Sequence, residues 1–416
     1  MIKKTRDVIV IGAGHAGLSI SYLLDKLKVD HIVLEKGVVG QSWKTQRWDS
    51  FLMVTPNKTN TLPGEQKAEN PNGYSSAQDF YSRLDRYAES NSLPVQNNCN
   101  VISVTKDHEV FKLITETNEK LVLHCKQLVI ASGFQNKPVF PAFSKDVYPS
   151  VTQIHSSQYR NALNLAPGKI LVIGSGQSGI QIAQDLISAG REVILSTSRV
   201  GRVPRTYRRL DIVDWFIKIG HYDQFSVSEN EVASESIASQ PQISGGNRPE
   251  LVDNYYSLYR NGVKLIGSIV GFNANNTHSM KVNPDLQSNI SYARGYFEHI
   301  KRIIDDYIRE HQLENECQNN TNSFEPSISD ILDCSTFDLI ENKVSTIIWA
   351  TGFQGDFGYI KLPIFENGAI KHREGISDID GLYFLGLPWM RKRKSGIVWG
   401  ITEDANFIAD KIISHL

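Results

Sequence analysis

The chain is poor in cysteine, and its few cysteines lie far apart. Four cysteines occur in 416 residues, and no two of them form a C-x-x-C pair. This spacing argues against a redox-active dithiol and a zinc site, and it is typical of a protein from a reducing compartment. We therefore expect no metal site, a cytoplasmic location and inert thiols at Cys99, Cys125, Cys317 and Cys334.

The sequence also lacks an excess of one charge and long apolar runs. Lys and Arg number 44 and Asp and Glu number 45, which leaves a net charge of −1 at pH 7. Such a balance gives no electrostatic reason to bind nucleic acid or an anionic membrane. No segment approaches the ~20 apolar residues of a membrane span, and the apolar run after Lys3 and Lys4 is too short for a signal peptide. We expect neither nucleic acid nor membrane as a partner.

What the sequence does contain is two glycine-rich turns, each between an apolar strand and a helical pattern. The strands are expected over residues 7–11 and 169–173. The first turn comprises Gly12, Ala13, Gly14, His15, Ala16 and Gly17, and the second comprises Gly174, Ser175, Gly176, Gln177, Ser178 and Gly179. This G-x-G-x-x-G pattern brings the backbone close to a pyrophosphate and aims a helix N-terminus at its charge. Two such units in one chain indicate two bound dinucleotides that exchange electrons.

The strand that follows each turn indicates which dinucleotide it takes. Glu35 lies 18 residues after Gly17, where a carboxylate accepts hydrogen bonds from an adenosine ribose and repels a 2′-phosphate. The first unit therefore suits FAD or NAD. In the second unit the corresponding residue is Thr197, and the hydroxyl of Ser198 and the guanidinium of Arg199 match a 2′-phosphate. We predict NADPH there, and the alternative is that Arg199 is a solvated loop charge.

A duplicated strand and glycine turn defines the domain layout. Residues 126–134 are expected to form a buried strand that ends in a glycine turn, and residues 344–353 repeat that design. These patterns predict an α/β protein with two Rossmann-like dinucleotide-binding domains. The NADPH-binding domain (163–335) is inserted into the FAD-binding domain (1–162 and 336–416). Amphipathic helices are expected over 301–312 and 402–416, and a polar surface loop over 315–327.

Together these motifs resemble the flavin-containing monooxygenase superfamily, in particular its compact bacterial CzcO-like branch. The FAD fingerprint, the NADPH fingerprint and both "ATG" linkers, at 131–134 and 350–353, occur in the family's order over essentially the whole chain. The family's segment before the NADPH domain is kept at His155 and Tyr159, whereas Pro149 and Val151 replace Phe and Gly. For His155 we favour a linker role, hydrogen-bonded to backbone, over proton transfer.

The resemblance implies roles for further residues. A loop after Glu35 would wrap the flavin, with Trp43 against the isoalloxazine and Arg47 at the diphosphate, whereas Trp48 is expected in the core. Gly352 in the second linker is implied to contact a cofactor. Asn57 is the candidate catalytic residue, because related monooxygenases use a loop asparagine at the reactive edge of the flavin. A plain turn asparagine is the alternative for Asn57.

The resemblance further implies an NADPH- and O2-dependent FAD monooxygenase. It would oxygenate a small lipophilic substrate bearing nitrogen, sulfur or a carbonyl through a flavin hydroperoxide. Two alternatives stay open: an NAD(P)H-dependent flavin reductase or diaphorase without oxygen insertion, and a non-catalytic nucleotide-sensing module. Specificity is expected from residues 203–261, whose segment 214–222 forms a helix either over the cleft or on the NADPH domain. The basic run 391–394 is expected to be a solvated face, and assembly into a homodimer stays open.

Overall fold

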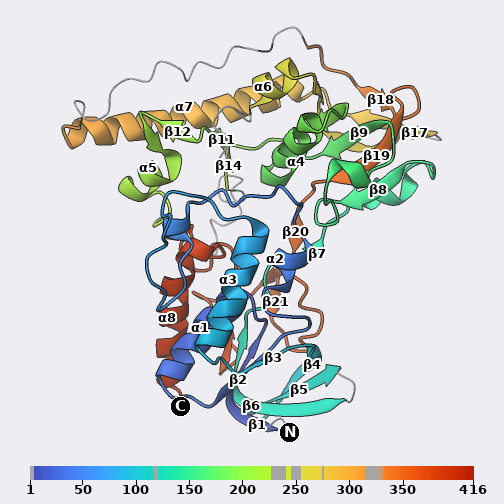
Figure 1. The fold of residues 1–416 in the computed structure, drawn as a ribbon. Helices are drawn as coiled ribbons and strands as arrows, with labels where there is room; N and C mark the ends of the chain where they lie inside the picture. Colours follow the sequence, from blue (N-terminus) through green and yellow to red (C-terminus); the bar gives the residue numbers. More distant parts are fainter. Residues whose placement is uncertain are drawn as a thin grey trace.

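The computed structural model describes residues 4–116, 120–225, 240–244, 254–273, 276–313, 328 and 331–416. Figure 1 shows two lobes, one above the other, each built around its own β-sheet. Both termini lie in the lower lobe, whereas the middle of the sequence forms the upper lobe. The fold is therefore mixed α/β, and the N- and C-terminal parts of the chain fold together.

The lower sheet combines parallel and antiparallel strands. Its order is β3 (Val95–Gln96), β2 (His31–Leu34), β1 (Thr5–Ile11), β6 (Leu121–Ile130), β5 (Val110–Glu116) and β4 (Asn100–Asp107), with β23 (Leu382–Phe384) also paired to β6. β1 runs parallel to β2 and β6, and β23 runs parallel to β6. Residues 8–11 of β1 and all of β2 and β23 are buried, as expected where both faces of the parallel part of a sheet are covered. β5 is antiparallel to its neighbours and alternates buried with exposed residues, as expected where one face meets water.

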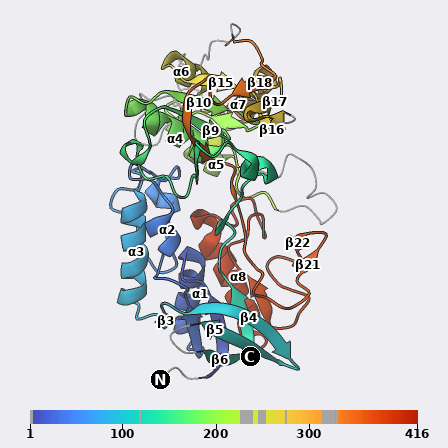
Figure 2. The ribbon, with the colours of Figure 1, turned by 90° about the vertical axis from the view of Figure 1, so that its right-hand side faces the viewer.

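Helices of the lower lobe begin where the sequence predicts. α1 (His15–Lys26) starts directly after the first glycine turn, and α3 (Ala77–Ser90) starts with a capping box. In that box, the Ser76 hydroxyl accepts from the Asp79 amide and the Asp79 carboxylate accepts from the Ser76 amide, which satisfies two free donors. α8 (Ile401–Ile413) is the closing amphipathic helix expected over 402–416, and it packs against α1 (Figures 1 and 2).

The upper sheet is entirely parallel. Its order is β15 (Lys264–Ile266), β10 (Val193–Ser196), β9 (Lys169–Ile173), β19 (Val344–Trp349) and β8 (Thr152–His155). The upper lobe also contains α4 (Gln177–Ser188), α6 (Tyr255–Arg260) and α7 (Leu286–Glu310). An antiparallel sheet of β16 (Ile269–Asn273), β17 (Asn276–Val282) and β18 (Thr336–Asp338) adjoins it.

The helix expected over 301–312 is only the end of a longer one. α7 begins at Leu286, and its buried face includes Ala293 and Phe297 before it reaches the predicted segment. Gly295 and several polar residues interrupt the apolar period of the first half, which is why the pattern did not reveal it. Trp215 of α5 (Ile212–Lys218) shares a hydrophobic cluster with this face. α5 therefore packs on the upper lobe. The loop expected over 315–327 lies outside the described residues.

Strand pairing corrects the expected boundaries between the two nucleotide units. Residues 152–155 and 344–349 were assigned to the FAD-binding unit, but as β8 and β19 they pair within the upper sheet. β18 also pairs with β17 of the upper lobe, so the chain returns to the lower lobe after β19 and not near residue 336. The return runs beside the outward path, because β20 (Phe353–Gln354) pairs antiparallel with β7 (Lys137–Pro138) between the lobes (Figure 1).

Short elements fill the loops of both lobes. They are α2 (Gln41–Thr45), the 3-10 helices η1 (Asn57–Thr59), η2 (Ala142–Asp146), η3 (Ala162–Asn164) and η4 (Val398–Gly400), and the strand pairs β11 (Arg202–Val203) with β14 (Gln242–Ile243), β12 (Thr206–Tyr207) with β13 (Leu210–Asp211), and β21 (Phe365–Glu366) with β22 (Ala369–Ile370). β14 is in turn bonded to Gln177 at the start of α4, through both backbone groups of Ile243.

Candidate functional site

The two glycine turns have the same backbone geometry. The φ angle is +104° at Gly12 and +105° at Gly174, a region that favours glycine. A Cβ at Gly12 would lie 2.5 Å from the carbonyl oxygen of Ala131, and a Cβ at Gly174 would lie 2.5 Å from that of Ala350. Each fingerprint therefore packs directly against one of the two "ATG" linkers, which explains why the chain carries both motifs twice.

The other two glycines of each turn differ in the space around them. A Cβ at Gly17 would lie 1.8 Å from the Gly12 oxygen, and a Cβ at Gly179 would lie 1.8 Å from the Gly174 oxygen, so helix and turn leave no room for a side chain. A Cβ at Gly14 or Gly176 would meet nothing within 4 Å.

Gly14 and Gly176 are also the N-caps of α1 and α4, and neither helix has a side-chain cap. These helix N-termini face open space with free N–H donors, which fits the pyrophosphate of a dinucleotide.

Glu35 joins the end of β2 to the first glycine turn. Its Oε2 accepts a hydrogen bond of 2.8 Å from the Ala13 amide, and its Oε1 accepts one of 2.9 Å from the Gly37 amide. The side chain is buried. Each carboxylate oxygen keeps a second lone pair for a ribose hydroxyl, so this geometry fits the role predicted from the sequence.

The second turn is held by a hydroxyl cluster that includes Ser198. The Ser175 hydroxyl lies 2.7 Å from the hydroxyl of Tyr255 and accepts a hydrogen bond of 2.9 Å from the Ser198 amide. Tyr255, on α6, was not found from the sequence, because 80 residues separate it from Ser175. Thr197 points inward and donates to the Ile266 carbonyl at 2.9 Å.

Arg199 and Gln177 extend this cluster in two directions. The Arg199 guanidinium lies 4.5 Å from the ring centre of Tyr292 on α7. The Gln177 amide bonds both backbone groups of Ile243, accepting from its N–H at 2.9 Å and donating to its carbonyl at 3.1 Å. The structure thus places Ser198 against Ser175 of the turn and Arg199 over Tyr292 of α7, and it ties β14 to the start of α4. The binding roles of Ser198 and Arg199 stay predictions.

Trp43 and Arg47 lie together in the loop after β2. The Trp43 ring packs edge-on against Phe80 of α3 at 4.7 Å, and the Arg47 guanidinium lies 5.0 Å above Trp43. Burial lowers the pKa of Arg47 to about 10, so it stays protonated at neutral pH. No carboxylate of the described residues pairs with it, which leaves a partly buried cation that fits an anionic ligand. Trp48 is buried in a core cluster, as expected.

The side chain of Asn57 is engaged within its own loop. Its Nδ2 donates to the Asn70 carbonyl at 3.0 Å, and its Oδ1 accepts from the Ser75 hydroxyl at 2.7 Å. These bonds are those of a turn asparagine. A catalytic role for Asn57 stays a prediction, and it requires that one of these bonds be given up.

His155 has the contacts of a linker residue. Its Nδ1 accepts from the Ser157 amide at 3.2 Å, so the proton lies on Nε2, which donates to the Gly352 carbonyl at 3.0 Å. Burial lowers its pKa, which keeps the ring neutral. His155 therefore ties the end of β8 to the second "ATG" linker, in agreement with the structural interpretation. Gly352 itself has φ +85°, and a Cβ there would meet nothing within 4 Å.

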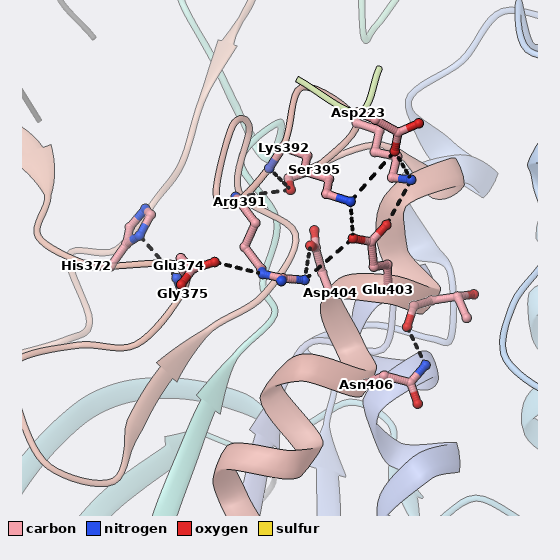
Figure 3. A network of polar contacts seen from close by, with 12 residues as sticks. Asp223, His372, Glu374, Gly375, Arg391, Lys392, Ser395, Glu403, Asp404 and Asn406 are labelled. Carbon is pink, nitrogen blue, oxygen red and sulfur yellow. Dashed lines mark hydrogen bonds and ion pairs between the residues drawn. The ribbon is translucent and has the colours of Figure 1, made fainter. Parts of the chain in front are cut away.

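The basic run 391–394 is not a solvated face, so that expectation was wrong. The side chains of Arg391, Lys392 and Lys394 are only 13%, 16% and 14% exposed. Lys392 and Lys394 pair with Glu403 on α8 at 2.5 and 2.8 Å, and Lys394 also pairs with Asp223 at 2.6 Å (Figure 3). The sequence pattern did not reveal this cluster, because Asp223 comes from a segment distant in the sequence.

The buried carboxyl group of Asp404 should make the stability of the protein depend on pH. Burial raises its pKa to about 6, against the opposing effects of the Ser395 hydroxyl and of Arg391, whose Nη1 lies 3.6 Å from Oδ1. The folded protein therefore takes up this proton at a higher pH than the unfolded chain, and Asp404 favours folding more as the pH falls from about 6 to about 4. Asp404→Asn should remove on the order of 3 kcal/mol of this pH dependence.

Urea unfolding of both proteins across this pH range measures the effect. Asp410→Asn, an exposed site on the same helix, is the control and should keep the pH dependence of the parent. Lys392 and Lys394 lower the pKa of Glu403, so Glu403 changes the stability with pH in the opposite direction. The test is therefore the difference in pH dependence between the variant and the parent. Identical profiles for parent and Asp404→Asn would contradict this account.

We searched the described part of the chain for metal sites, membrane-spanning helices and reactive thiols. It contains no cluster of three His, Cys, Asp or Glu side chains suited to a metal ion, and no helix long and apolar enough to cross a bilayer. Burial raises the pKa of Cys99, Cys125 and Cys334, which disfavours their thiolates. Cys317 lies outside the described residues.

Comparison with known proteins places these features in a family. A family model described as pyridine nucleotide-disulphide oxidoreductase matches residues 9–210. The chain is 30% identical over 414 residues to an uncharacterized CzcO-like oxidoreductase of Geobacillus kaustophilus, covering 98% of this chain and 99% of that protein.

Solved structures show the same fold. A flavin-containing monooxygenase from Stenotrophomonas maltophilia matches with a TM-score of 0.67 and 15% identity over 99% of both chains. A bacillithiol disulfide reductase from Bacillus cereus matches with a TM-score of 0.64 and 15% identity over 99% of this chain and 100% of that one. By its full-length similarity to the CzcO-like oxidoreductases, the chain belongs to that family.

Proposed function

We propose that the protein is an NADPH- and O2-dependent FAD monooxygenase acting on a small-molecule substrate. The observation that carries this proposal is the duplicated turn, in which Gly14 and Gly176 each leave open space at an uncapped helix N-terminus. When bound, FAD would take a hydride from NADPH and activate dioxygen. The protein's own residues would bind the two dinucleotides, orient them and keep water out.

FAD is assigned to the lower lobe. The free amides at the start of α1 would hold its pyrophosphate, and Glu35 would accept hydrogen bonds from its adenosine ribose. Arg47 would supply positive charge to the diphosphate, and Trp43 beside it would border the flavin. The free amides, the acid and the cation come from α1, β2 and the following loop of one βαβ unit.

NADPH is assigned to the upper lobe, which we propose as a dinucleotide-binding domain inserted between the two parts of the FAD-binding domain. The start of α4 would hold the pyrophosphate, and Ser198 and Arg199 would hold the 2′-phosphate. No acid stands where Glu35 stands in the first unit, so a phosphate is not repelled.

A disulfide reductase is the second candidate, because the fold also matches such an enzyme. That chemistry needs an accessible thiolate. The thiols of the described residues do not supply one, since Cys99 and Cys125 are buried and burial also raises the pKa of Cys334. A sensing module needs one nucleotide site, whereas both turns of this chain keep the same geometry. These observations favour the monooxygenase.

Oxygen transfer is tested on the purified holoenzyme. The protein is reduced with NADPH without oxygen and then mixed with heavy-isotope dioxygen and a thioether, an amine or a ketone. We expect one labelled oxygen atom in a product, with a matching loss of hydrogen peroxide. Full recovery of the electrons as peroxide with every probe class would favour a reductase, and failure to retain FAD would favour a sensor.

Arg199 is expected to set the preference for NADPH. Arg199→Ala should raise the KM for NADPH by about 10- to 100-fold, because charge-assisted hydrogen bonds to a phosphate are worth about 1 to 3 kcal/mol. The KM for NADH, which has no 2′-phosphate, should stay near that of the parent. Arg302→Ala, an exposed arginine on α7, is the control. An equal change for both cofactors would remove Arg199 from the phosphate site.

A further inference from the structure

Arg393 is a buried cation that pairs with no anion among the described residues. It is 8% exposed, and its Nε has no hydrogen-bond partner. Its Nη2 makes one long bond of 3.4 Å to the Tyr296 hydroxyl, and the guanidinium lies 5.3 Å from the ring centre of Trp389. No carboxylate of the described chain pairs with it, whereas its neighbours Lys392 and Lys394 both pair with Glu403. Burying a guanidinium without an anionic partner costs free energy of folding, unless a ligand supplies the missing anion.

Two further buried polar side chains nearby also lack partners. The Nε2 of His221 has none, although its ring stacks on Phe216 at 4.4 Å. Burial, with a smaller effect of the positive charge of Arg393, lowers the pKa of His221 to about 3, so the ring is neutral. Gln242 is 2% exposed, and neither its Nε2 nor its Oε1 has a partner. Buried polar groups are nearly always hydrogen-bonded, so three such side chains in one region point to a missing partner.

Backbone contacts bring the segments of these three residues together near Tyr296. The Arg393 amide donates to the Gln224 carbonyl at 2.8 Å, and the Lys394 amide donates to the Tyr222 carbonyl, which places the segment of His221 beside Arg393. The Gln242 amide donates to the Gly201 carbonyl at 2.8 Å. Gly201 lies against the ring of Tyr296, with 2.6 Å between a Cβ at Gly201 and the ring.

This cluster, formed by His221, Gln242, Tyr296 and Arg393, lies between the two nucleotide units. β14 carries Gln242 and is tied to the start of α4 through the bonds between Gln177 and Ile243. The segment of Arg393 precedes α8 of the lower lobe, whose first turn pairs with its neighbours (Figure 3). A ligand in this cluster would therefore lie between an element that is tied to the second glycine turn and the segment that precedes α8.

We propose that the cluster binds a carboxylate of the substrate, so that the molecule oxygenated is an organic anion. This inference rests on the proposed function. The guanidinium of Arg393 would bind the two carboxylate oxygens, as its planar donors match them. The Tyr296 hydroxyl and the amide of Gln242 would donate to the same group, and neutral His221 adds a donor when its proton is on Nε2. The substrate would therefore have two parts: an apolar part that carries the atom to be oxidised, and an acidic end that Arg393 binds.

The test compares acids with their neutral amides. The probes are (methylthio)acetate, (phenylthio)acetate and 3-(phenylthio)propionate, each beside the corresponding carboxamide. Binding to the oxidised holoenzyme is followed by the change in flavin absorbance, and sulfoxide formation gives KM and kcat. We expect at least one acid to bind about tenfold or more tightly than its amide. Arg393→Gln should abolish this preference and Arg393→Lys should keep part of it, whereas Arg86→Gln, at an exposed site on α3, should leave it unchanged.

Other outcomes overturn the inference. If none of the acids binds better than its amide, or if Arg393→Gln keeps the preference for the acid, Arg393 does not bind a carboxylate of the substrate. If Arg393→Gln instead lowers FAD content or slows reduction by NADPH, Arg393 serves a cofactor and the inference is wrong. The proposed function has its own test, in which reduction of the bound flavin by NADPH is measured in the parent protein without any probe. The proposed function fails if NADPH does not reduce that flavin.

Discussion

Replacing Gly176 by alanine should leave the fold intact and remove most of the affinity for NADPH. A Cβ at this position meets no protein atom within 4 Å, and its backbone φ of −69° suits alanine. The same Cβ would stand where a pyrophosphate must approach the start of α4. We expect an unfolding free energy within about 1 kcal/mol of the parent and an NADPH affinity lowered at least about tenfold.

Gly179→Ala should behave differently, although it lies in the same turn. Its Cβ would be 1.8 Å from the Gly174 carbonyl oxygen, so helix and turn must separate and the upper lobe should lose stability. Gly295→Ala on α7, where a Cβ has free space, is the control: it should keep the NADPH affinity of the parent and should not lose stability, because alanine is favoured over glycine in a helix interior by up to about 1 kcal/mol. Urea unfolding and NADPH titration of the three variants separate the two effects. If Gly176→Ala bound NADPH as tightly as Gly295→Ala, the open space at α4 would not be the pyrophosphate site.

Glu35→Ala should cost both stability and FAD. The carboxylate of Glu35 accepts from the amides of Ala13 and Gly37, and its removal would leave one buried and one half-buried donor unpaired. We expect a loss of about 2 to 4 kcal/mol in the unfolding free energy, because each unpaired group costs about 1 to 3 kcal/mol. Urea unfolding measures the stability, and the ratio of flavin to protein absorbance measures FAD retention.

Two control variants make the Glu35 result specific. Glu35→Gln keeps one acceptor oxygen, so its stability should fall between Glu35→Ala and the parent. Glu109→Ala, at an exposed turn between β4 and β5, should stay within about 0.5 kcal/mol of the parent and keep its FAD. If Glu35→Ala retained FAD as the parent does, the ribose contact assigned to Glu35 would be wrong.

The features predicted well from the sequence are those that a short segment determines by itself. The two glycine turns, the apolar strands before them and Glu35 at the end of β2 all lie within one strand–turn–helix unit each. The chemistry of such a unit depends on residues a few positions apart, so the pattern shows it directly. α8 was found for the same reason, since its buried residues repeat at helical spacing.

The features that were missed depend on partners distant in the sequence. β8 and β19 look like parts of the first unit, and only their pairing with each other and with β9 assigns them to the upper sheet. The run 391–394 reads as a solvated face until Asp223 and the first turn of α8 are brought against it. Tyr255 likewise meets Ser175 only in the fold.

The same limit applies to the proposed carboxylate site. Its side chains come from residues 221, 242, 296 and 393, and each one alone resembles an ordinary polar residue. His221, Gln242 and Arg393 are distinguished only by their burial with side-chain polar atoms that lack partners, and Tyr296 only by its contact with Arg393. Specificity in such a protein is thus the part of function that a linear pattern shows least, whereas dinucleotide binding is the part that it shows best.

The most direct test of the account is anaerobic titration of the purified protein with NADPH while the flavin absorbance is recorded. We expect a yellow protein whose bound FAD is bleached by NADPH, because in the proposed function the two dinucleotides would be held close enough for hydride transfer. A protein that stays colourless after incubation with FAD, or a bound flavin that remains oxidised in excess NADPH, would contradict it.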